Sequence, residues 1–264
     1  MKPLIHILGN GNVAQVLAVQ LTNSGYSIQS VYARKKENAN EIQTLTGAVV
    51  TDKISDIEKM QGIVFFALSD TATAEFCKRI KFKKDVLAVH TSGTLPDNLL
   101  AECSADYAVF YPFQSIHKTD EGNPFKGIPV GIYASKEESY QLLSNIAFSL
   151  SAEAFEITEK QRKVLHLSGV LSNNFTTFLI NEAAQLLKIN DLNPNLIAPL
   201  IKKTLNIPDF TKKQLPQTGP AIRNDKEIIR EHLKLLEKDH NLSEVYEMLT
   251  KSIRLRIKDN SSQL

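Results

Sequence analysis

The sequence lacks the surplus of basic residues on which nucleic-acid binders depend. Its 264 residues contain 31 Lys and Arg against 29 Asp and Glu, which gives a formal net charge of +2. Proteins that hold DNA or RNA through its phosphates carry a clear excess of positive charge. We therefore expect no nucleic acid among the partners of this protein.

Cysteine is also scarce. Cys77 and Cys103 are the two cysteines of the chain. They show neither the spacing of a metal site nor a disulfide framework, which fits a reducing compartment. We expect no metal centre.

Long hydrophobic runs are missing as well. No charged residue occurs between Pro3 and Ala33, but glycines and polar residues interrupt this stretch, and its apolar run Leu4–Leu8 is short. A membrane span needs about 20 predominantly apolar residues, and a signal peptide needs a charged start and a cleavage site. We expect a cytoplasmic protein with no membrane attachment and no leader to remove.

What the sequence does contain is a regular alternation of short apolar runs and helix-like segments. Several runs are continuously apolar, as in strands that are buried on both faces of a parallel sheet. Such alternation predicts an α/β fold with a doubly wound sheet of the Rossmann type. The expected strands are Leu4–Leu8, Ile28–Ala33, Ala48–Val50, Ile63–Leu68, Val86–His90, Val109–Tyr111, Ile128–Tyr133 and Glu153–Ile157.

The pattern changes after Ile157, where every further segment reads as a helix. We expect a Rossmann domain over residues 1–157 and an all-helical domain over 158–264, packed together without a linker. Ser, Thr or Asn followed three residues later by Glu or Gln, or directly by Pro, marks a helix start. The expected starts are Ser135 with Glu138, Thr158 with Gln161, Asn193-Pro194, Asn224 with Glu227 and Asn241 with Glu244.

A dinucleotide fingerprint follows the first strand. The segment Gly9–Ala14 reads G-x-G-x-x-A, in which Gly9 permits a tight turn and Gly11 lets the backbone approach a pyrophosphate. Ala14 keeps the helix and the strand close, and the helix opened by Val13 points its positive end at the phosphates. The alternative is a glycine-rich turn of an unrelated α/β fold. The expected contacts to the cofactor are Gly9, Asn10, Gly11, Asn12 and Val13.

The end of the second strand indicates which dinucleotide binds. NAD and FAD binders usually place an Asp or Glu there, but this chain has Arg34 and Lys35, and its first acid is Glu37. A guanidinium can stack on adenine and donate two hydrogen bonds to a 2′-phosphate. We expect NADP; the alternative is a solvated basic turn.

Two later loops leave the carboxyl ends of strands, where open α/β sheets bind their ligands. Leu68 and Ser69 follow the fourth strand, and Thr91, Ser92 and Gly93 follow the fifth. We expect all five to contact the cofactor, the second loop at its nicotinamide half. The alternative is an ordinary Ser/Thr-rich turn.

Five blocks of the sequence, taken in order, carry a resemblance to known proteins. They are Gly9–Ala14, Val89–Gly93, Tyr111–Gln114, His166–Asn174 and Gln217–Asp225. The chain resembles the 6-phosphogluconate dehydrogenase-like superfamily, which includes pyrroline-5-carboxylate reductase, ketopantoate reductase and deazaflavin-dependent NADP oxidoreductases. More closely, it resembles bacterial Rossmann-like proteins with a helical C-terminal domain of unknown function. The resemblance implies an NADP-linked oxidoreductase but no substrate, and many relatives have His where this chain has Tyr111.

The stretch from Val164 to Asn181 contains no charged residue. A helix without charge on any face is usually buried. At 100° per residue His166 and Asn173 share one stripe of it, and buried polar groups need partners. We expect this stripe to face the cofactor, with His166 as proton donor, because imidazole exchanges protons near neutral pH, and Asn173 orienting the substrate. The alternative is a helix–helix interface, as in a dimer.

Arg223 follows Gly-Pro in the block Gln217–Asp225. We expect it to hold a substrate carboxylate or phosphate. The alternative is that it pairs with Asp225 and fixes the loop.

The sequence thus predicts an NADP-dependent oxidoreductase that transfers hydride between nicotinamide and a small carbonyl, imine or alcohol. The alternative is a non-catalytic NADP-binding sensor or scaffold, which the absence of a lysine on the charge-free helix and the presence of Tyr111 favour. A Rossmann methyltransferase is disfavoured by the basic end of the second strand. We also expect a homodimer, because one small helical domain offers little cover for the charge-free helix.

Overall fold

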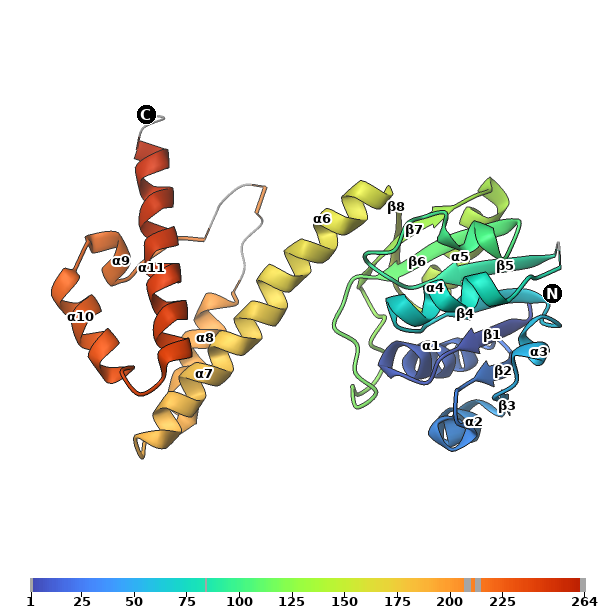
Figure 1. Cartoon of the computed structure of the whole chain (residues 1–264), viewed down its shortest axis with the longest axis horizontal. Coiled ribbons are helices and arrows are strands. Elements are labelled where there is room, and N and C mark those ends of the chain that lie inside the picture. The colour runs from blue at the N-terminus through green and yellow to red at the C-terminus, as the bar shows by residue number, and fades with distance from the viewer. Residues whose placement is uncertain (1, 84, 207–209, 212–214, 262–264) are drawn as a thin grey trace. The chain divides into compact units, whose positions relative to one another are not determined.

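The protein consists of two compact units, residues 1–174 and 175–264 (Figure 1). The computed structural model describes residues 2–83, 85–206, 210–211 and 215–261.

Unit 1 is built on one sheet of eight strands in the order β3-β2-β1-β4-β5-β6-β7-β8. Neighbouring strands are parallel except for β6 and β7, which are antiparallel. The first six strands have the Rossmann order, so the predicted fold class is confirmed. The strands are β1 (Ile5–Leu8), β2 (Ile28–Tyr32), β3 (Val49–Thr51), β4 (Gly62–Phe66), β5 (Val86–His90), β6 (Asp106–Pro112), β7 (Pro129–Ala134) and β8 (Glu153–Glu156).

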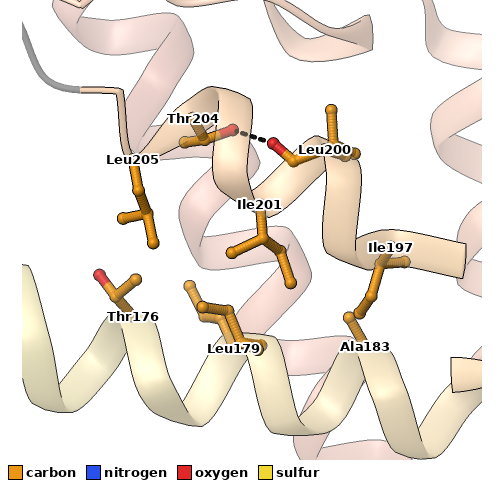
Figure 2. A pocket seen from close by; sticks show the side chains of 9 residues that line it. Thr176, Leu179, Ala183, Ile197, Leu200, Ile201, Thr204 and Leu205 are labelled. Carbon is orange, nitrogen blue, oxygen red and sulfur yellow. Dashed lines mark hydrogen bonds between the residues drawn. The ribbon is translucent and has the colours of Figure 1, made fainter. Parts of the chain in front are cut away.

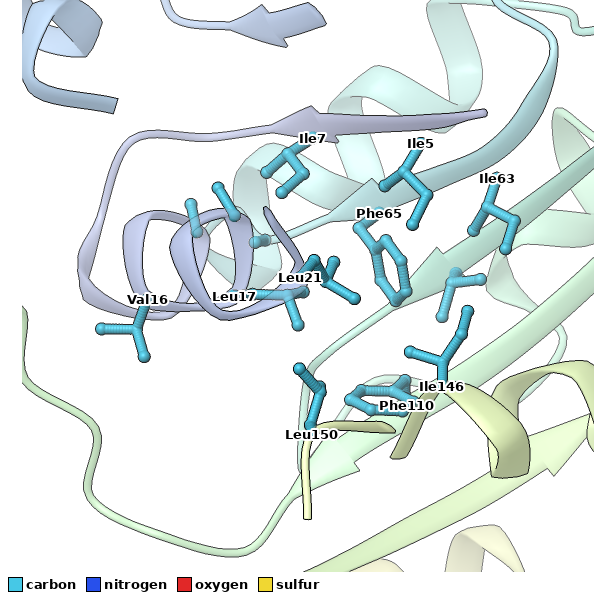
Figure 3. Close-up of a cluster of buried hydrophobic side chains, with 14 of the residues drawn as sticks. Ile5, Ile7, Val16, Leu17, Leu21, Ile63, Phe65, Phe110, Ile146 and Leu150 are labelled. Carbon is cyan, nitrogen blue, oxygen red and sulfur yellow. The ribbon is translucent and has the colours of Figure 1, made fainter. Parts of the chain in front are cut away.

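Helices cover both faces of this sheet. On one face α1 (Asn12–Asn23), α2 (Asn40–Thr46) and α5 (Glu137–Ser149) bury a large apolar cluster against the strands. Figure 3 shows Leu17 and Leu21 of α1 beside Phe65 and Phe110 of the sheet. The two phenylalanine rings meet edge to face, with centroids 5.7 Å apart, an arrangement that aromatic pairs favour.

The other face is covered by a second cluster, whose helices are α3 (Ile54–Ile57), α4 (Asp70–Arg79) and the short η2 (Leu99–Glu102). Apolar residues on both faces explain why the strands are continuously apolar in sequence. A further short helix, η1 (Lys36–Ala39), follows β2. The sheet therefore presents the ends of β1, β2, β4 and β5 as its ligand-binding edge.

The expected helix from Thr158 is present but contains an irregularity. Its first part is α6 (Glu159–Gly169), capped by Thr158 and Gln161 as predicted. A π-helical turn, η3 (Val170–Asn174), then ends unit 1. Such turns are rare and occur frequently at functional sites. The wider turn also changes the angular spacing on which the stripe from His166 to Asn173 was predicted.

Unit 2 contains helices and no strand among its described residues. The helices are α7 (Phe175–Ile189), η4 (Pro194–Ile197), α8 (Ala198–Thr204), α9 (Pro220–Arg223), α10 (Lys226–Leu235) and α11 (His240–Ser261). Asn193 caps η4 beside a proline, as expected.

An apolar groove of about 280 Å³ lies between α7 and the pair η4 and α8. In Figure 2, Leu179 and Ala183 of α7 face Ile201 of α8 and Ile197 of η4.

Two predicted helix starts in unit 2 are misplaced. Asn224 adopts a left-handed conformation and ends α9, whereas Asp225 precedes α10. Asp239, rather than Asn241, caps α11 through the N–H of Leu242, at 2.9 Å. Asn and Asp serve equally well as helix caps and left-handed helix ends, so the short motif does not separate these roles.

The predicted cap Ser135 is also wrong. Its hydroxyl donates to Asp106 at 3.1 Å and accepts the N–H of Tyr107, while Lys136 precedes α5 without a side-chain cap. The hydroxyl is thus used between strands rather than along the helix.

The expected burial of the charge-free helix is not found within a single chain. Five apolar residues of this helix, spaced three and four apart, are 39% to 59% exposed: Val164, Leu167, Leu171, Phe175 and Phe178.

Among the described residues no helix combines the length and apolarity needed to cross a membrane.

Candidate functional site

The fingerprint turn after β1 has the backbone that its glycines predict. Gly9 has φ +129°, and a Cβ there would lie 2.2 Å from the carbonyl oxygen of Ala67. No side chain fits at that distance, so Gly9 is required for the close approach of β1 and β4. α1 begins at Asn12 without a side-chain cap, which leaves its first N–H groups free to meet a ligand.

Gly11 is different, because a Cβ there would meet no protein atom within 4 Å. It opens onto a cleft of about 480 Å³ in unit 1. The absence of a side chain at this point leaves room for a phosphate beside the start of α1, so the residues present fit a dinucleotide. The cleft is lined by Gly11, Asn12, Val13, Ala67, Leu68, Ser69, Asp70, Thr91, Ser92, Gly93, Thr94, Ile116 and His166.

The cleft therefore unites most of the residues singled out in the sequence. The first, fourth and fifth strands all contribute, since the carboxyl ends of parallel strands share one edge of the sheet. Gly9 is not among the residues that line the cleft. Asn10 donates from Nδ2 to the carbonyl oxygen of Asn38 at 3.2 Å and so ties the turn to the segment after β2. Arg34 and Lys35 are exposed in that segment, and their part in cofactor binding stays a prediction.

The loop after β5 is held from within by His90, which is fully buried. Its Nδ1 accepts the N–H of Ser92 at 3.3 Å, and its Nε2 lies 3.3 Å from the carbonyl oxygen of Pro96. Burial, with a smaller contribution from Arg162, lowers the pKa of His90 to about 4. This histidine is thus a neutral, hydrogen-bonded support for the loop.

Arg162 of α6 secures the same loop from outside. Its guanidinium is fully buried and donates to the carbonyl oxygens of Ser92 and Leu95 at 2.7 and 2.6 Å. It also donates to Asp97 Oδ1 at 2.7 Å. A buried charge is tolerated only when it is paired and hydrogen-bonded. These three bonds pair the guanidinium through its two terminal nitrogens, while its Nε has no hydrogen-bond partner among the described residues.

Asp97 and Glu159 complete this junction. The N–H of Asp97 donates to Glu159 Oε2, and the N–H of Glu159 donates to Asp97 Oδ2, both at 3.1 Å. Burial raises the pKa of Asp97, while Arg162 opposes the shift. The start of α6 is thereby fixed to the loop that lines the cleft.

One turn after Arg162, the imidazole of His166 reaches the cleft. Its Nδ1 lies 3.1 Å from the hydroxyl of Tyr111, at the end of β6. A Cβ at Gly93 would lie 2.6 Å from that nitrogen, and one at Gly169 would lie 2.8 Å from the ring of Phe113. Two glycines therefore allow α6 to pack closely enough for His166 to reach Tyr111. Burial raises the pKa of this tyrosine.

Asn173 lies in η3 and donates from Nδ2 to Ser115 Oγ, in the segment after β6. It does not line the cleft, whereas Ile116, next to its partner, does. The structure thus brings Asn173 to the segment that borders the cleft, and its role toward substrate stays a prediction.

Arg223 belongs to unit 2, where it is the last residue of α9, and its side chain is exposed. The alternative pairing with Asp225 is absent from the ion pairs of the described residues. Asp225 directly precedes α10, and its side chain does not cap that helix. A substrate-binding role for Arg223 stays a prediction.

The sequence reasoning missed Arg162, Asp97 and Asp70. Thr94 donates to Asp70, so the loops after β4 and β5 are joined across the cleft. In the sequence Arg162 follows the predicted capping box and lies two residues before the start of the charge-free stretch. No local pattern reveals that its partners lie some 65 to 70 residues earlier in the chain.

Comparisons with known proteins point to one family. A family model described as "NADP oxidoreductase coenzyme F420-dependent" matches residues 4–92, and one described as a domain of unknown function, DUF2520, matches residues 128–253. Among curated proteins, none matches the chain.

Several solved structures are similar. A Bacteroides fragilis protein assigned as an NADP oxidoreductase is 35% identical with a TM-score of 0.87, covering 96% of this chain and 98% of its own. An Aspergillus terreus reductive aminase in complex with NADPH is 14% identical, with a TM-score of 0.71 and coverage of 98% and 95%. Pyrroline-5-carboxylate reductase of Streptococcus pyogenes is 14% identical, with a TM-score of 0.60 and coverage of 96% and 98%. The last two show a shared fold alone.

The first of these relatives supports the same family as the order of sequence blocks and the Rossmann arrangement of the strands. The protein belongs to the family of the Bacteroides fragilis NADP oxidoreductase, and its chain matches an NADP oxidoreductase domain followed by DUF2520.

Proposed function

We propose that this oxidoreductase transfers hydride between NADP and a small carbonyl, imine or alcohol at the cleft of unit 1. The observation that carries the proposal is the position of His166, which lines the same cleft as the fingerprint turn and the loop after β5. NADPH would supply the hydride to a carbonyl or imine, and NADP+ would accept it from an alcohol. The family to which the chain belongs agrees with the cofactor expected from the sequence. The chain must then bind the dinucleotide and supply a proton.

His166 is the proposed proton donor. Reduction of a carbonyl or imine places a negative charge or a basic lone pair on the substrate, and a positioned acid typically contributes 10²–10⁴-fold to such a step. As an imidazolium, His166 would carry a proton on each ring nitrogen, and the one on Nδ1 would be donated to the Tyr111 hydroxyl oxygen, 3.1 Å away. The proton on Nε2 would pass to the substrate, which leaves a neutral imidazole.

The cofactor part is tested at Gly11. Gly11→Val places a side chain in the space beside α1, where its Cβ would meet no protein atom within 4 Å, so it should abolish NADPH binding while leaving the melting temperature unchanged. Calorimetric titration and a thermal melt measure the two effects. Retained affinity would show that the fingerprint serves only as a packing turn.

The catalytic part is tested by NADPH oxidation with a panel of keto acids, imines and aldehydes. Once a substrate is found, His166→Ala should lower turnover at least about 10²-fold without changing NADPH affinity. Tyr111→Phe, which keeps the ring and removes the hydroxyl, should have a smaller effect. An equal loss in both variants would point to Tyr111 as the donor instead. NADPH binding with no oxidation on any substrate would favour the sensor alternative.

Selectivity for NADP over NAD is proposed to come from Arg34 and Lys35. Arg34→Ala should weaken NADPH about tenfold or more and leave NADH nearly unchanged, because a bidentate, charge-assisted contact contributes roughly 1.5–3 kcal/mol. Equal affinities of the unaltered protein for both cofactors would contradict this proposal. Asn173 and Arg223 are the residues proposed to hold the substrate.

A homodimer is also proposed, and the exposed apolar residues of the charge-free helix support it. Apolar residues at spacings of three and four form one side of a helix, and such a side is ordinarily covered. Phe178→Glu should convert a species of twice 29.5 kDa into a monomer in sedimentation. Val49→Glu, at an exposed apolar position of the sheet edge, is the matched control. A monomer before substitution would contradict the proposal.

A further inference from the structure

The segment that follows β6 runs along the fingerprint turn. The hydroxyl of Ser115 accepts a hydrogen bond from Asn173. Ile116 is buried and lines the cleft. Two residues later the N–H of Lys118 donates to Asn12 Oδ1 at 3.4 Å. Because Asn12 is the first residue of α1, this segment is anchored beside the phosphate-binding end of that helix.

The side chain of Lys118 extends from this anchor toward α2. Its Nζ lies 3.6 Å from Glu41 Oε2, and the two side chains are 53% and 58% exposed. An ion pair this exposed contributes little to stability, since water and salt screen it. The ammonium is therefore free to change partners at little cost. The 2′-phosphate and the pyrophosphate of NADP each carry about two negative charges over several oxygens, which makes either a stronger partner than a single carboxylate.

The surroundings of Lys118 are those of the dinucleotide. Asn12 lines the cleft, and Asn10 ties the fingerprint turn to Asn38 of η1, the short helix that leads into α2. The basic turn after β2 lies in the same connection, where Lys36 is held by Asp52 at 3.6 Å. The charged groups of these elements are Arg34, Lys35, Lys36, Glu37, Glu41, Asp52 and Lys118.

We propose that Lys118 is a cofactor-binding residue, which leaves Glu41 and pairs with a phosphate of the bound dinucleotide. The inference rests on the proposed binding of NADP. It adds a cation from the connection between β6 and β7, about 80 residues after the basic turn, to a site whose other expected residues follow β1, β2, β4 and β5. Glu41 acts as a counter-ion that competes with the phosphate.

The test compares Lys118→Met with Lys126→Met, a control in the same connection between β6 and β7. Methionine removes the ammonium and keeps the main-chain N–H that binds Asn12, so the fold should be unaffected. We expect Lys118→Met to weaken NADPH at least about fivefold in calorimetric titration and Lys126→Met to leave it unchanged. Glu41→Gln, which removes the competing carboxylate, should strengthen NADPH binding about two- to fivefold.

Titration with NADH identifies the phosphate. If Lys118→Met weakens NADPH alone, the partner is the 2′-phosphate; if it weakens both cofactors equally, the partner is the pyrophosphate. Unchanged affinity for both cofactors would overturn the inference while leaving the proposed function standing. Failure of the unaltered protein to bind either cofactor would overturn both.

Discussion

The two units differ in how they bury apolar surface. Unit 1 encloses two clusters of buried side chains, one on each face of its sheet. In the described part of unit 2, by contrast, Ala221 and Leu236 are the buried apolar residues, while leucines and phenylalanines of its helices are widely exposed. A sheet with helices on both faces completes its core within one chain, whereas a few amphipathic helices leave apolar faces that need another surface.

This contrast extends to the polar groups. The cleft of unit 1 is surrounded by hydrogen bonds among His90, Ser92, Asp97, Glu159 and Arg162. The groove of unit 2, between α7 and α8, is lined almost entirely by aliphatic side chains (Figure 2). The first arrangement holds loops in place for a polar ligand, and the second offers area for packing.

The largest loss of stability is expected from a substitution in the core of unit 1. Phe65→Ala removes a fully buried ring that packs edge to face on Phe110. Large-to-small substitutions of buried aromatic residues cost about 3–5 kcal/mol. Urea unfolding should show this loss, and Phe148→Ala, at a position that is 82% exposed, should cost less than about 0.5 kcal/mol. Similar losses of stability for the two variants would contradict the difference in burial between Phe65 and Phe148.

The next effect concerns pH and the loop after β5. The pKa of His90 is lowered to about 4 by burial, so an unfolded chain, with its histidine near 6.5, binds a proton that the folded chain refuses. Stability is therefore complete above about pH 6.5 and falls by about 3 kcal/mol as the pH drops toward 4. His90→Asn should remove this part of the slope in urea unfolding between pH 7 and 4.5. A ring resonance assigned to His90, by its loss in His90→Asn, that titrates near 6.5 in the folded protein would contradict the assignment.

A pair of leucines tests unit 2. Leu236→Ala, at a buried position after α10, should cost about 2 kcal/mol, whereas Leu200→Ala, 66% exposed in the groove, should cost less than about 0.5 kcal/mol in a monomer. Thermal melts at several protein concentrations measure both. A large, concentration-dependent loss for Leu200→Ala would show that a second surface covers the groove.

The smallest effect lies at the start of α6. Thr158→Ala removes the hydroxyl that accepts the N–H of Gln161 in the capping box. Loss of such a cap costs about 1 kcal/mol. Lys160→Ala, in the same turn and outside the box, is the control in chemical unfolding. An unchanged midpoint for Thr158→Ala would mean that Arg162 and Glu159 alone fix this helix to unit 1.

Prediction from the sequence was accurate where the signal is local and repeated. All eight strands were expected close to their observed positions, because a buried parallel strand must be apolar on both faces. Helix starts were less predictable: Thr158 and Asn193 serve as expected, but Ser135, Asn224 and Asn241 do not. A single hydroxyl or amide binds whichever backbone group lies nearest, and a four-residue motif does not specify that neighbour.

The candidate site shows the same division. The fingerprint glycines and the loop Thr91–Gly93 were located from sequence, since each role is set by local backbone and strand position. The contact between His166 and Tyr111 was not, because it depends on the tight packing of α6 against Gly93. Arg162 was missed for the same reason, since its partners are distant in sequence.

The sequence alone predicted the strands of a Rossmann-type sheet, the glycine turn and the basic end of β2, because periodicity, backbone freedom and charge are properties of neighbouring residues. Tertiary structure alone decided that the charge-free helix is exposed in one chain, that a π-turn divides it, and that a buried arginine joins it to the loop after β5. These features depend on which distant segments pack together, and burial and pairing are decided by packing rather than by residue type.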